Sequence, residues 1–455
     1  MLHTLKKIFA AALAVVLLAP ALATPAAAMS GYDPDFEVTA EAAYIVNLDT
    51  NLVVYEKNSE TPLVAGSLTK LMTMILLLKN YQDQLDTITV TAPGYIYDYL
   101  YGKGASSADI RRGETHTLRT LLYAMEVQSG NEAAYIVADY MGGGSIDNFV
   151  AMMNAEAEAI GCTGTTFTDP CGLDEGNITT ARDSYLLLRA AMEYDAFVEA
   201  AGVYTWQVPQ SSAHDAPYTI ISTNRMISSA SELYRSYTQG GKTGSLSSGW
   251  QNFASWHTQD GETYISVLLH SSDEIGNTPA EIETGQLMDW VFATFGVGAA
   301  LDTTQPISEL PVRYATEAES VMLYPVDNMM TLLPREGGAA VTEQTFNLPE
   351  SLAAPVTQGE VVGSVTISIE GEEVGTVDLI AGSNVSRWRS TPLSGWRRCS
   401  SPSTKKESAS AADPCAFYTV YTPQKEPCPM LDIKRNLTTM TDFYELTMSN
   451  GYFEQ

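Results

Sequence analysis

The order of strand-like and helical segments constrains this chain more than any other feature of its sequence. Apolar, β-branched runs flank a polar turn within residues 42–56, and similar runs at residues 250–256 and 263–270 flank Asp260-Gly261. Such runs around a short polar turn are typical of β-hairpins. Helical segments lie between the two hairpins. We therefore expect one α/β domain, whose antiparallel sheet is assembled from both of its ends and covered by helices.

The helical segments differ in how apolar they are. Residues 68–78 are apolar almost all round, which predicts a helix buried in the middle of the domain. A second buried helix is expected from Leu118, with Ser129-Gly130-Asn131 interrupting or abutting it. Residues 149–160 show the 3.6-residue period of a further helix, and residues 280–295 are expected to form the helix that closes the domain.

From about residue 306 the sequence changes to short β-rich runs with turn residues between them. The expected strands are 320–324, 330–333, 340–348, 361–369 and 376–380. This pattern predicts a small all-β domain over residues 306–385. It carries no cluster of reactive side chains, so we expect it to serve spacing or docking. The preceding domain is expected over residues 29–305.

The charge of the chain limits its partners. Its 455 residues include 54 acidic and 25 basic ones, for a net charge of −29. Residues 29–386 alone hold 47 acidic and 14 basic residues. A surface this negative repels phosphate groups, so nucleic acid is excluded as a partner and phosphorylated substrates are disfavoured.

The first 28 residues have the pattern of an export signal. Lys6 and Lys7 precede an apolar run at residues 8–22, and Ala26-Ala27-Ala28 matches a small-residue cleavage site. We expect the mature protein to begin near Met29, outside the cytoplasm, in the cell wall or at the outer face of the cytoplasmic membrane. An uncleaved membrane anchor is the alternative.

Cysteine and histidine usage gives no sign of a metal site or cofactor. Cys162 and Cys171 either pair across a short loop in an oxidising compartment or remain buried thiols. The histidines lack the spacing of zinc ligands, and no metal or cofactor is expected. His214-Asp215 lies in a polar loop, which disfavours a Ser-His-Asp triad there.

The first of three motifs is Ser67-Leu68-Thr69-Lys70. It places a hydroxyl and an amine one helical turn apart on the same side of a helix. Serine needs a base to become a nucleophile, and lysine can act as that base only where burial or nearby positive charge destabilises its ammonium form. The same pattern recurs at residues 403–406 in a polar segment, so the buried helix behind Ser67 is what distinguishes the first match.

The other two motifs follow in the chain. Ser129-Gly130-Asn131 offers a second hydroxyl and an amide able to grip a peptide backbone, although a simple turn is the alternative, as the similar Ser222-Thr223-Asn224 shows. Lys242-Thr243-Gly244 offers an ammonium and a hydroxyl for a carboxylate, and its glycine permits close approach to an edge strand. A strand entry with a solvated lysine is the alternative there.

In this order, the three motifs resemble the penicillin-binding protein and serine β-lactamase superfamily. Residues 127–134, 167–174 and 179–183, with Asn224-Arg225, look like the D-alanyl-D-alanine carboxypeptidase branch, over about residues 36–385. The resemblance implies a β-lactamase/transpeptidase-like fold, with an antiparallel sheet covered by helices and an all-helical subdomain, followed by a small all-β domain. The implied activity is removal of the terminal D-alanine from peptidoglycan stem peptides, with β-lactam antibiotics as inhibitors and without a cofactor.

The resemblance also implies roles for individual residues. Ser67 would be the nucleophile and Lys70 its base, and Ser129 would pass a proton to the departing D-alanine. Substrate binding would fall to Asn131 for the amide, to Lys242 and Thr243 for the terminal carboxylate, to the N–H groups of Ser67 and Ser245 for the oxyanion, and to Arg225 for the field near Lys242.

Two alternatives and two departures accompany this interpretation. A β-lactamase would need a Glu-x-x-x-Asn pair to activate water, and none lies between Asn131 and Lys242. A non-catalytic β-lactam sensor or scaffold is the second alternative. Members of the family usually carry an arginine shortly before the closing helix, whereas residues 277–281 have none, and Cys171 occupies a position where the family often has histidine or asparagine.

The end of the chain does not fit this family. Its members usually finish with an amphipathic or membrane-spanning helix, but residues 386–455 begin as an Arg, Ser, Pro and Cys mixture without a hydrophobic period. Residues 430–455, with Thr441-Asp442-Phe443-Tyr444, resemble the start of nicotinate phosphoribosyltransferase. Our hypothesis is a frame error near residue 386 that reads into a neighbouring gene. A disordered functional tail is the alternative.

Overall fold

The computed structural model describes residues 33–272, 276–335, 342–369 and 371–388. The expected export signal and the segment that resembles nicotinate phosphoribosyltransferase lie outside these residues. Within the described ranges, no helix combines the length and the apolar character needed to cross a membrane.

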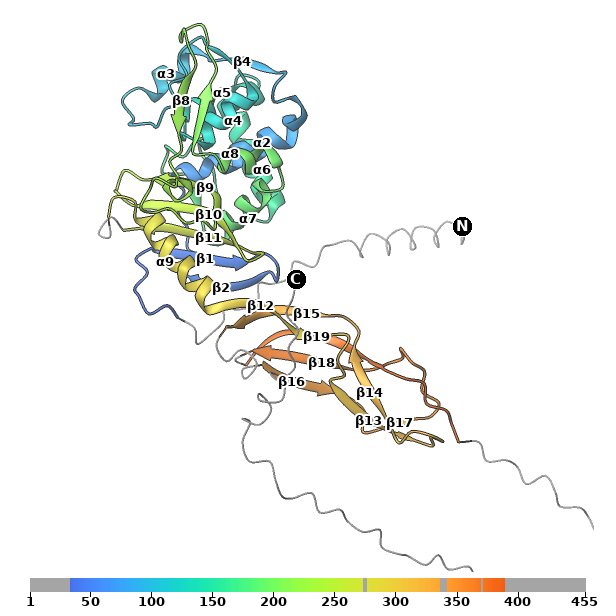
Figure 1. Ribbon diagram of the computed structural model, residues 1–455. Coiled ribbons are helices and arrows are strands. Elements are labelled where there is room, and N and C mark those ends of the chain that lie inside the picture. Colours follow the sequence, from blue (N-terminus) through green and yellow to red (C-terminus); the bar gives the residue numbers. More distant parts are fainter. Residues whose placement is uncertain (1–32, 273–275, 336–341, 370, 389–455) are drawn as a thin grey trace, which may run out of the picture. The chain divides into compact units, whose positions relative to one another are not determined.

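An antiparallel sheet of five strands forms the centre of the first region (Figure 1), in the order β2-β1-β11-β10-β9. The strands are β1 (Ala42–Asn47), β2 (Leu52–Lys57), β9 (Thr238–Ser245), β10 (Gln251–Gln259) and β11 (Glu262–Ser271). β1 pairs with β11, so Ala42 lies opposite Leu269 although the two are far apart in sequence. Both predicted hairpins and the assembly of the sheet from the two ends of the domain are confirmed.

Both faces of this sheet are covered. Successive side chains of a strand point to opposite faces, and in β1 Tyr44 and Val46 pack into the main helical core, whereas Ala43 and Ile45 pack against the helix α9 (Pro279–Thr294). All six residues of β1 are buried. The nearly continuous apolar run of this strand follows from that double coverage.

The helices other than α9 lie on the opposite side of the sheet and extend away from it (Figure 1). They are α2 (Thr69–Tyr81), α3 (Gly94–Leu100), α4 (Leu118–Glu126), α5 (Asn131–Met141), α6 (Ile146–Ile160), α7 (Ala181–Ala191) and α8 (Asp195–Ala201). The predicted helices are confirmed, with shifted ends; α2, for example, continues to Tyr81. α6 begins before Phe149 because the Ser145 hydroxyl accepts the Asn148 N–H as an N-cap, and α9 ends at Thr294 because Phe295 begins a strand.

Three short strand pairs and three short 3₁₀ turns connect these elements. The pairs are β3 (Leu63–Val64) with β6 (Ile178–Thr179), β4 (Thr89–Thr91) with β5 (Thr115–Thr117), and β7 (Thr205–Val208) with β8 (Tyr218–Ile221). The 3₁₀ turns are η1 (Gly66–Leu68), η2 (Gln82–Gln84) and η3 (Arg225–Ile227).

The second region is built from strands, as predicted. A six-stranded sheet has the order β16-β18-β19-β14-β13-β17, and β12 pairs with β15. The strands are β12 (Phe295–Leu301), β13 (Ser308–Arg313), β14 (Ser320–Pro325), β15 (Met329–Pro334), β16 (Thr342–Asn347), β17 (Leu352–Ala353), β18 (Val361–Ile369) and β19 (Glu372–Ala381). β12, β13 and β17 are strands that the pattern did not predict, since β12 is rich in Gly and Ala and β13 contains Pro311.

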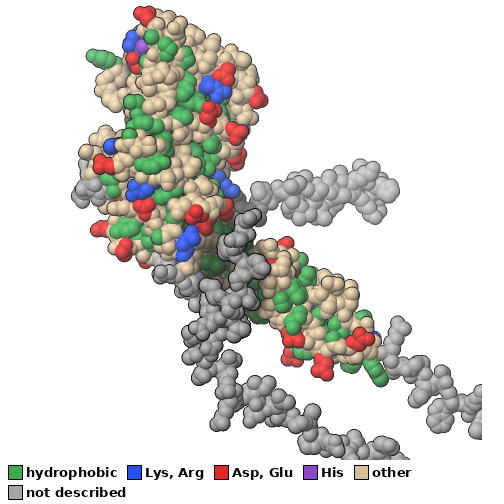
Figure 2. All heavy atoms as spheres, in the orientation of Figure 1, with side chains coloured by type: hydrophobic (Ala, Val, Ile, Leu, Met, Phe, Trp, Pro, Cys, Tyr) green, Lys and Arg blue, Asp and Glu red, His purple; other side chains and the backbone are tan. Residues whose placement is uncertain are grey.

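The charged side chains do not mark a binding site by themselves. On the face shown in Figure 2, acidic side chains are spread over both regions rather than gathered into one patch. The described residues also contain no group of three or more His, Cys, Asp or Glu side chains arranged to hold a metal ion. The candidate site must therefore be sought at the motifs.

Candidate active site

Ser67 and Lys70 meet at the start of the central helix. Ser67 lies in the 3₁₀ turn η1, and Lys70 lies in the first turn of α2, where the apolar neighbours of the motif anchor the helix in the core. The Lys70 Nζ donates to the Ser67 Oγ over 2.9 Å. The predicted one-turn spacing therefore produces a direct hydrogen bond between the amine and the hydroxyl.

The environment of Lys70 favours its neutral form. The side chain is completely buried, and its Nζ also donates to the Cys171 carbonyl over 2.8 Å. Burial lowers the pKa of Lys70 because it disfavours the ammonium, and the acidic groups nearby oppose this shift without outweighing it. A lysine with a lowered pKa that contacts a serine hydroxyl can take the proton of that hydroxyl.

The loop that supplies the Cys171 carbonyl is shaped by one carboxylate. Asp169 accepts the backbone N–H groups of Cys171, Gly172, Leu173 and Asp174 at 2.6–3.0 Å. Cys162 and Cys171 are both buried and do not form a disulfide, so of the two alternatives the structure has free thiols. The loop offers a main-chain oxygen to Lys70, and the Cys171 thiol and the Lys70 amine also act on each other's pKa. Sequence reasoning had not identified Asp169 or this carbonyl.

Ser129 and Asn131 lie where α4 gives way to α5. Ser129 has a φ of 57°, in the left-handed region, and the Asn131 N–H donates to the Ser106 carbonyl over 2.9 Å. The Ser129 Oγ and the Asn131 Oδ1 are buried and have no hydrogen bond partner among the described residues. Unpaired buried polar atoms of this kind are costly and suit atoms that bind a ligand.

The third motif lies on β9, the edge strand of the sheet, as predicted. Lys242 is completely buried, and its Nζ donates to the Thr243 carbonyl over 3.1 Å, while the Thr243 Oγ1 donates to the Thr223 Oγ1 over 2.6 Å. A Cβ on Gly244 would lie 3.5 Å from the Ser67 nitrogen and 3.3 Å from the Ala65 carbonyl oxygen. A side chain at this position would therefore contact the turn that carries Ser67, and the expected role of the glycine, to let a ligand approach the edge strand, stays a prediction.

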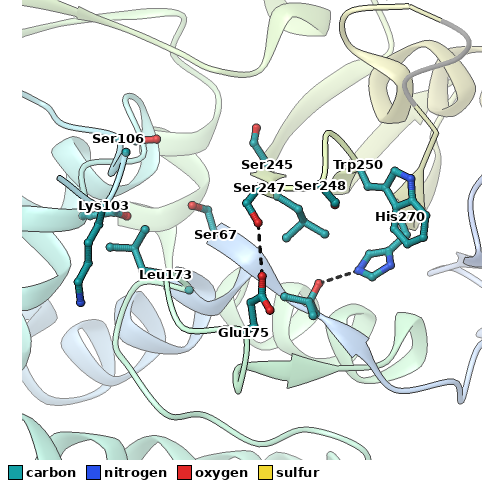
Figure 3. A pocket seen from close by; sticks show the side chains of 15 residues that line it. Ser67, Lys103, Ser106, Leu173, Glu175, Ser245, Ser247, Ser248, Trp250 and His270 are labelled. Atoms are coloured by element: carbon teal, nitrogen blue, oxygen red, sulfur yellow. Dashed lines mark hydrogen bonds between the residues drawn. The ribbon is translucent and has the colours of Figure 1, made fainter.

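A cavity of about 530 Å³ is lined by one residue of each of the first two motifs and by Ser245, which follows the third, whereas Lys70, Ser129, Lys242 and Thr243 are not in its lining (Figure 3). Ser67, Asn131 and Ser245 all line it. Its other walls come from the segments around Lys103, Leu173, Ser247 and Trp250, together with Glu175 and His270. Figure 3 shows Ser67 between the Lys103 side and the side of Trp250 and His270, so the serine faces an open space large enough for a short peptide.

Arg225, the predicted residue near Lys242, contacts Glu281 in the structure. Its N–H donates to the Glu281 Oε1 over 2.6 Å, and its charge lowers the pKa of Glu281, which burial raises to about 7. The charges that act on Lys242 are those of Glu126 and Lys70. An influence of Arg225 on the field near Lys242 therefore stays a prediction.

Glu126 is a buried residue of the site that sequence reasoning missed. It is the last residue of α4, and its charge acts on both Lys70 and Lys242. The signal was present in the sequence, because a carboxylate within the apolar stretch before Ser129 is rarely buried without a partner.

The known proteins that this chain resembles are D-alanyl-D-alanine carboxypeptidases. The family model for D-alanyl-D-alanine carboxypeptidase matches residues 27–273, and the model for the C-terminal domain of penicillin-binding protein 5 matches residues 301–387. D-alanyl-D-alanine carboxypeptidase DacF of Bacillus subtilis is 23% identical over 73% of this chain and 82% of its own length. DacC of Escherichia coli is 28% identical over 76% of this chain and 84% of its own length.

Solved structures support the fold. The D-alanyl-D-alanine carboxypeptidase DacD of Francisella tularensis aligns with a TM-score of 0.61 and 23% identity, covering 78% of this chain and 96% of its own. The DD-transpeptidase of Streptomyces K15 aligns with a TM-score of 0.52 and 28% identity, covering 57% of this chain and all of its own. Since the first family model matches more than half of the sequence, the chain belongs to the D-alanyl-D-alanine carboxypeptidase family.

Proposed function

We propose that this protein is an exported serine carboxypeptidase that removes the terminal D-alanine from peptidoglycan stem peptides through an acyl-serine intermediate, and that penicillin acylates the same serine. The hydrogen bond from Lys70 to Ser67 carries the proposal, because it couples a buried amine of lowered pKa to a hydroxyl that opens onto a cavity. Family membership supplies the reaction class.

In the proposed acylation, the Ser67 Oγ attacks the carbonyl between the two D-alanines while its proton moves to Lys70. The C–N bond then breaks, and the departing D-alanine leaves with a proton that Ser129 relays. The oxyanion that forms is held by the N–H groups of Ser67 and Ser245, which both line the cavity. Water hydrolyses the ester in a second step and regenerates Ser67.

Substrate recognition is assigned to the remaining groups of the site. The Asn131 amide holds the peptide, and its buried, unpaired Oδ1 is a ready acceptor for a substrate N–H. Lys242 and Thr243 receive the terminal carboxylate. Residues 277–281 lack the arginine usual in the family, so the proposal assigns this carboxylate to the two β9 residues.

The proposed location is outside the cytoplasm, where peptidoglycan lies. The support is the pattern of the first 28 residues, with a basic start, an apolar run and a small-residue end. Cell fractionation with an antibody to residues 29–385 tests it. A protein found only in the cytosol, at full precursor mass, contradicts it.

The test of the reaction uses two readouts with the full-length chain. D-alanine release from a stem-peptide mimic ending in D-Ala-D-Ala reports hydrolysis, and a fluorescent penicillin reports the acyl-enzyme. Ser67→Ala should abolish both, whereas Ser403→Ala, in the second match to the same motif, should change neither. A lasting adduct without D-alanine release would instead show a sensor, and rapid turnover of penicillin would show a β-lactamase.

A further inference from the structure

His214 is a histidine that the proposed reaction does not use, and both of its ring nitrogens face carboxylates. Its Nδ1 lies 2.7 Å from the Glu114 Oε1, and its Nε2 lies 2.9 Å from the Asp109 Oδ2. A neutral imidazole has one N–H group, so it can donate to one of these carboxylates and turns a lone pair toward the other. The geometry therefore fits the imidazolium, whose two N–H groups donate to both carboxylates.

The charged and titratable groups around the ring favour the same form. Those that face it are Asp109, Arg111, Glu114, His116 and Tyr218. The hydrogen bond to Asp109 raises the pKa of His214 and Glu114 adds to the rise, while burial and the charge of Arg111 oppose it. The imidazolium therefore persists above the ordinary histidine pKa of 6.5 and is lost as the pH rises further.

The contacts of His214 join two segments of the chain. His214 lies in the connection between β7 and β8, whereas its two carboxylate partners lie in residues 105–114, ahead of β5. Asp109 has a φ of 58°, in the left-handed region, which is uncommon for a residue with a Cβ. Such a conformation persists where contacts fix it, and the Asp109 carboxylate is held by His214 and Arg111.

Residues 105–114 are also bonded to the second motif. The Ser106 carbonyl accepts the Asn131 N–H over 2.9 Å, and Ser106 lines the cavity (Figure 3). The Glu132 Oε1 accepts the Ala108 N–H over 2.7 Å, and a Cβ on Gly130 would lie 3.0 Å from the Ala108 Cβ. Any movement of this segment must therefore move the cavity wall and the main chain of the motif.

We propose that His214 is a positioning residue of this site: in its protonated form it ties the connection between β7 and β8 to residues 105–114, and so fixes the cavity wall at Ser106 and the main chain of Asn131. This inference rests on the proposed function, because it uses the role assigned to Asn131 in holding the substrate. When the ring loses its proton, one of its two hydrogen bonds is lost and the segment loosens. Substrate is then turned over less efficiently as the pH rises.

His214→Phe tests this through the pH profile of kcat/KM for D-alanine release. Phenylalanine keeps a ring against Tyr218, whose hydroxyl donates to the Ala108 carbonyl over 2.8 Å, but it cannot bond the two carboxylates. Below the titration midpoint of His214 the variant should be slower than the wild type by about fivefold or more, as is usual for coupling between two sites.

Above that midpoint the two profiles should converge, because the wild type has lost the same proton. Groups that titrate in both proteins, such as Lys242 with a pKa lowered by burial to about 8, affect the two profiles equally. A purely structural role would instead lower the profile of the variant by one factor at every pH.

Asp109→Asn tests the source of the pH dependence. Asparagine keeps the size of the side chain and tolerates the left-handed conformation, but it removes the charge. The midpoint of His214, followed by NMR through the ring signal that His214→Phe lacks, should move about one pH unit toward acid, and the fall in kcat/KM should move with it. Asp215→Asn is the matched control, because Asp215 is exposed and makes no hydrogen bond to the ring within the described residues. It should leave both midpoints unchanged.

Hydrogen exchange tests the contact without an activity assay. The Ser211 N–H donates to the His214 carbonyl over 3.0 Å, so the connection between β7 and β8 contains a protected amide. Exchange of residues 209–217 in the wild type, corrected for its intrinsic pH dependence, should accelerate as the pH rises through the midpoint of His214. In His214→Phe it should be fast at every pH.

The outcomes separate this inference from the proposed function. Parallel kcat/KM profiles of the wild type and His214→Phe, or wild-type exchange that does not follow the midpoint, would overturn the inference. D-alanine release that depends on Ser67 would then leave the proposed function standing, whereas a wild type that releases no D-alanine would overturn both. Asp109→Asn and wild-type exchange keep the test decisive if the phenylalanine variant does not fold.

Discussion

Gly172→Ala should disable the serine without touching a reactive group. Gly172 follows the carbonyl that receives the Lys70 amine, and it has a φ of 87°. A Cβ built there would lie 1.8 Å from the Gly66 carbonyl oxygen and 3.0 Å from the Ser67 nitrogen. The glycine therefore sits directly against the turn that carries the nucleophile, and any side chain must push the two segments apart.

The size of the effect follows from this contact. Cβ contacts under 3.0 Å essentially do not occur, so the loop and the η1 turn must separate. Displacing a reacting group by roughly 1 Å costs about 100-fold in rate. The left-handed conformation adds roughly 1–2 kcal/mol of destabilisation for a residue with a Cβ. We expect penicillin acylation to slow by about 100-fold, with a loss of folding stability in addition.

Gly161→Ala is the matched control for this variant. Gly161 ends α6 with a φ of 96°, and a Cβ there would meet nothing within 4 Å. It should lose the same roughly 1–2 kcal/mol in denaturant unfolding and keep wild-type acylation. Acylation rates of the Gly172 variant equal to those of the control would refute the argument that the loop positions Ser67.

Three other predictions concern charge and burial. Lys70→Arg should slow acylation by at least about 100-fold because a guanidinium stays protonated in proteins. Circular dichroism checks that the variant is folded. If the folded variant acylates at the wild-type rate, Lys70 is not the base. Cys162 and Cys171 should resist thiol reagents in the native state and react after unfolding, because burial raises the pKa of each thiol to about 12; peptide mapping by mass spectrometry checks this, and native labelling at either site would contradict it. Burial acts to raise the pKa of Glu114, but hydrogen bonds, including one from His214, outweigh it and lower the pKa to about 2. The stabilisation that this carboxylate provides should be complete above its ordinary pKa of 4.5 and be lost as the pH falls toward 2. Glu114→Gln should therefore reduce the slope of the free energy of unfolding against pH in this acidic range. Equal slopes for the variant and the wild type would show that another group is responsible.

Much of the fold could be predicted because its elements are defined locally. The hairpin at β10 and β11 follows from apolar, β-branched runs around Asp260-Gly261, and α2 follows from a long apolar run. β12 could not be predicted in this way, because glycine and alanine dominate it and its pairing with β15 comes from a distant segment. Pairing between strands can override weak local preference.

In the candidate site, too, contacts set by the local backbone could be predicted, whereas contacts between distant segments could not. The sequence by itself determined the contact of Lys70 with Ser67, because a helical turn brings residues three apart to the same side, whatever surrounds them. Only the tertiary structure decided that the Cys171 carbonyl would meet the Lys70 amine and that the charge of Glu126 would act on Lys70 and Lys242. Helical spacing is a property of the local backbone, whereas the protonation state of a lysine depends on how completely water is excluded and on which charges distant segments bring beside it.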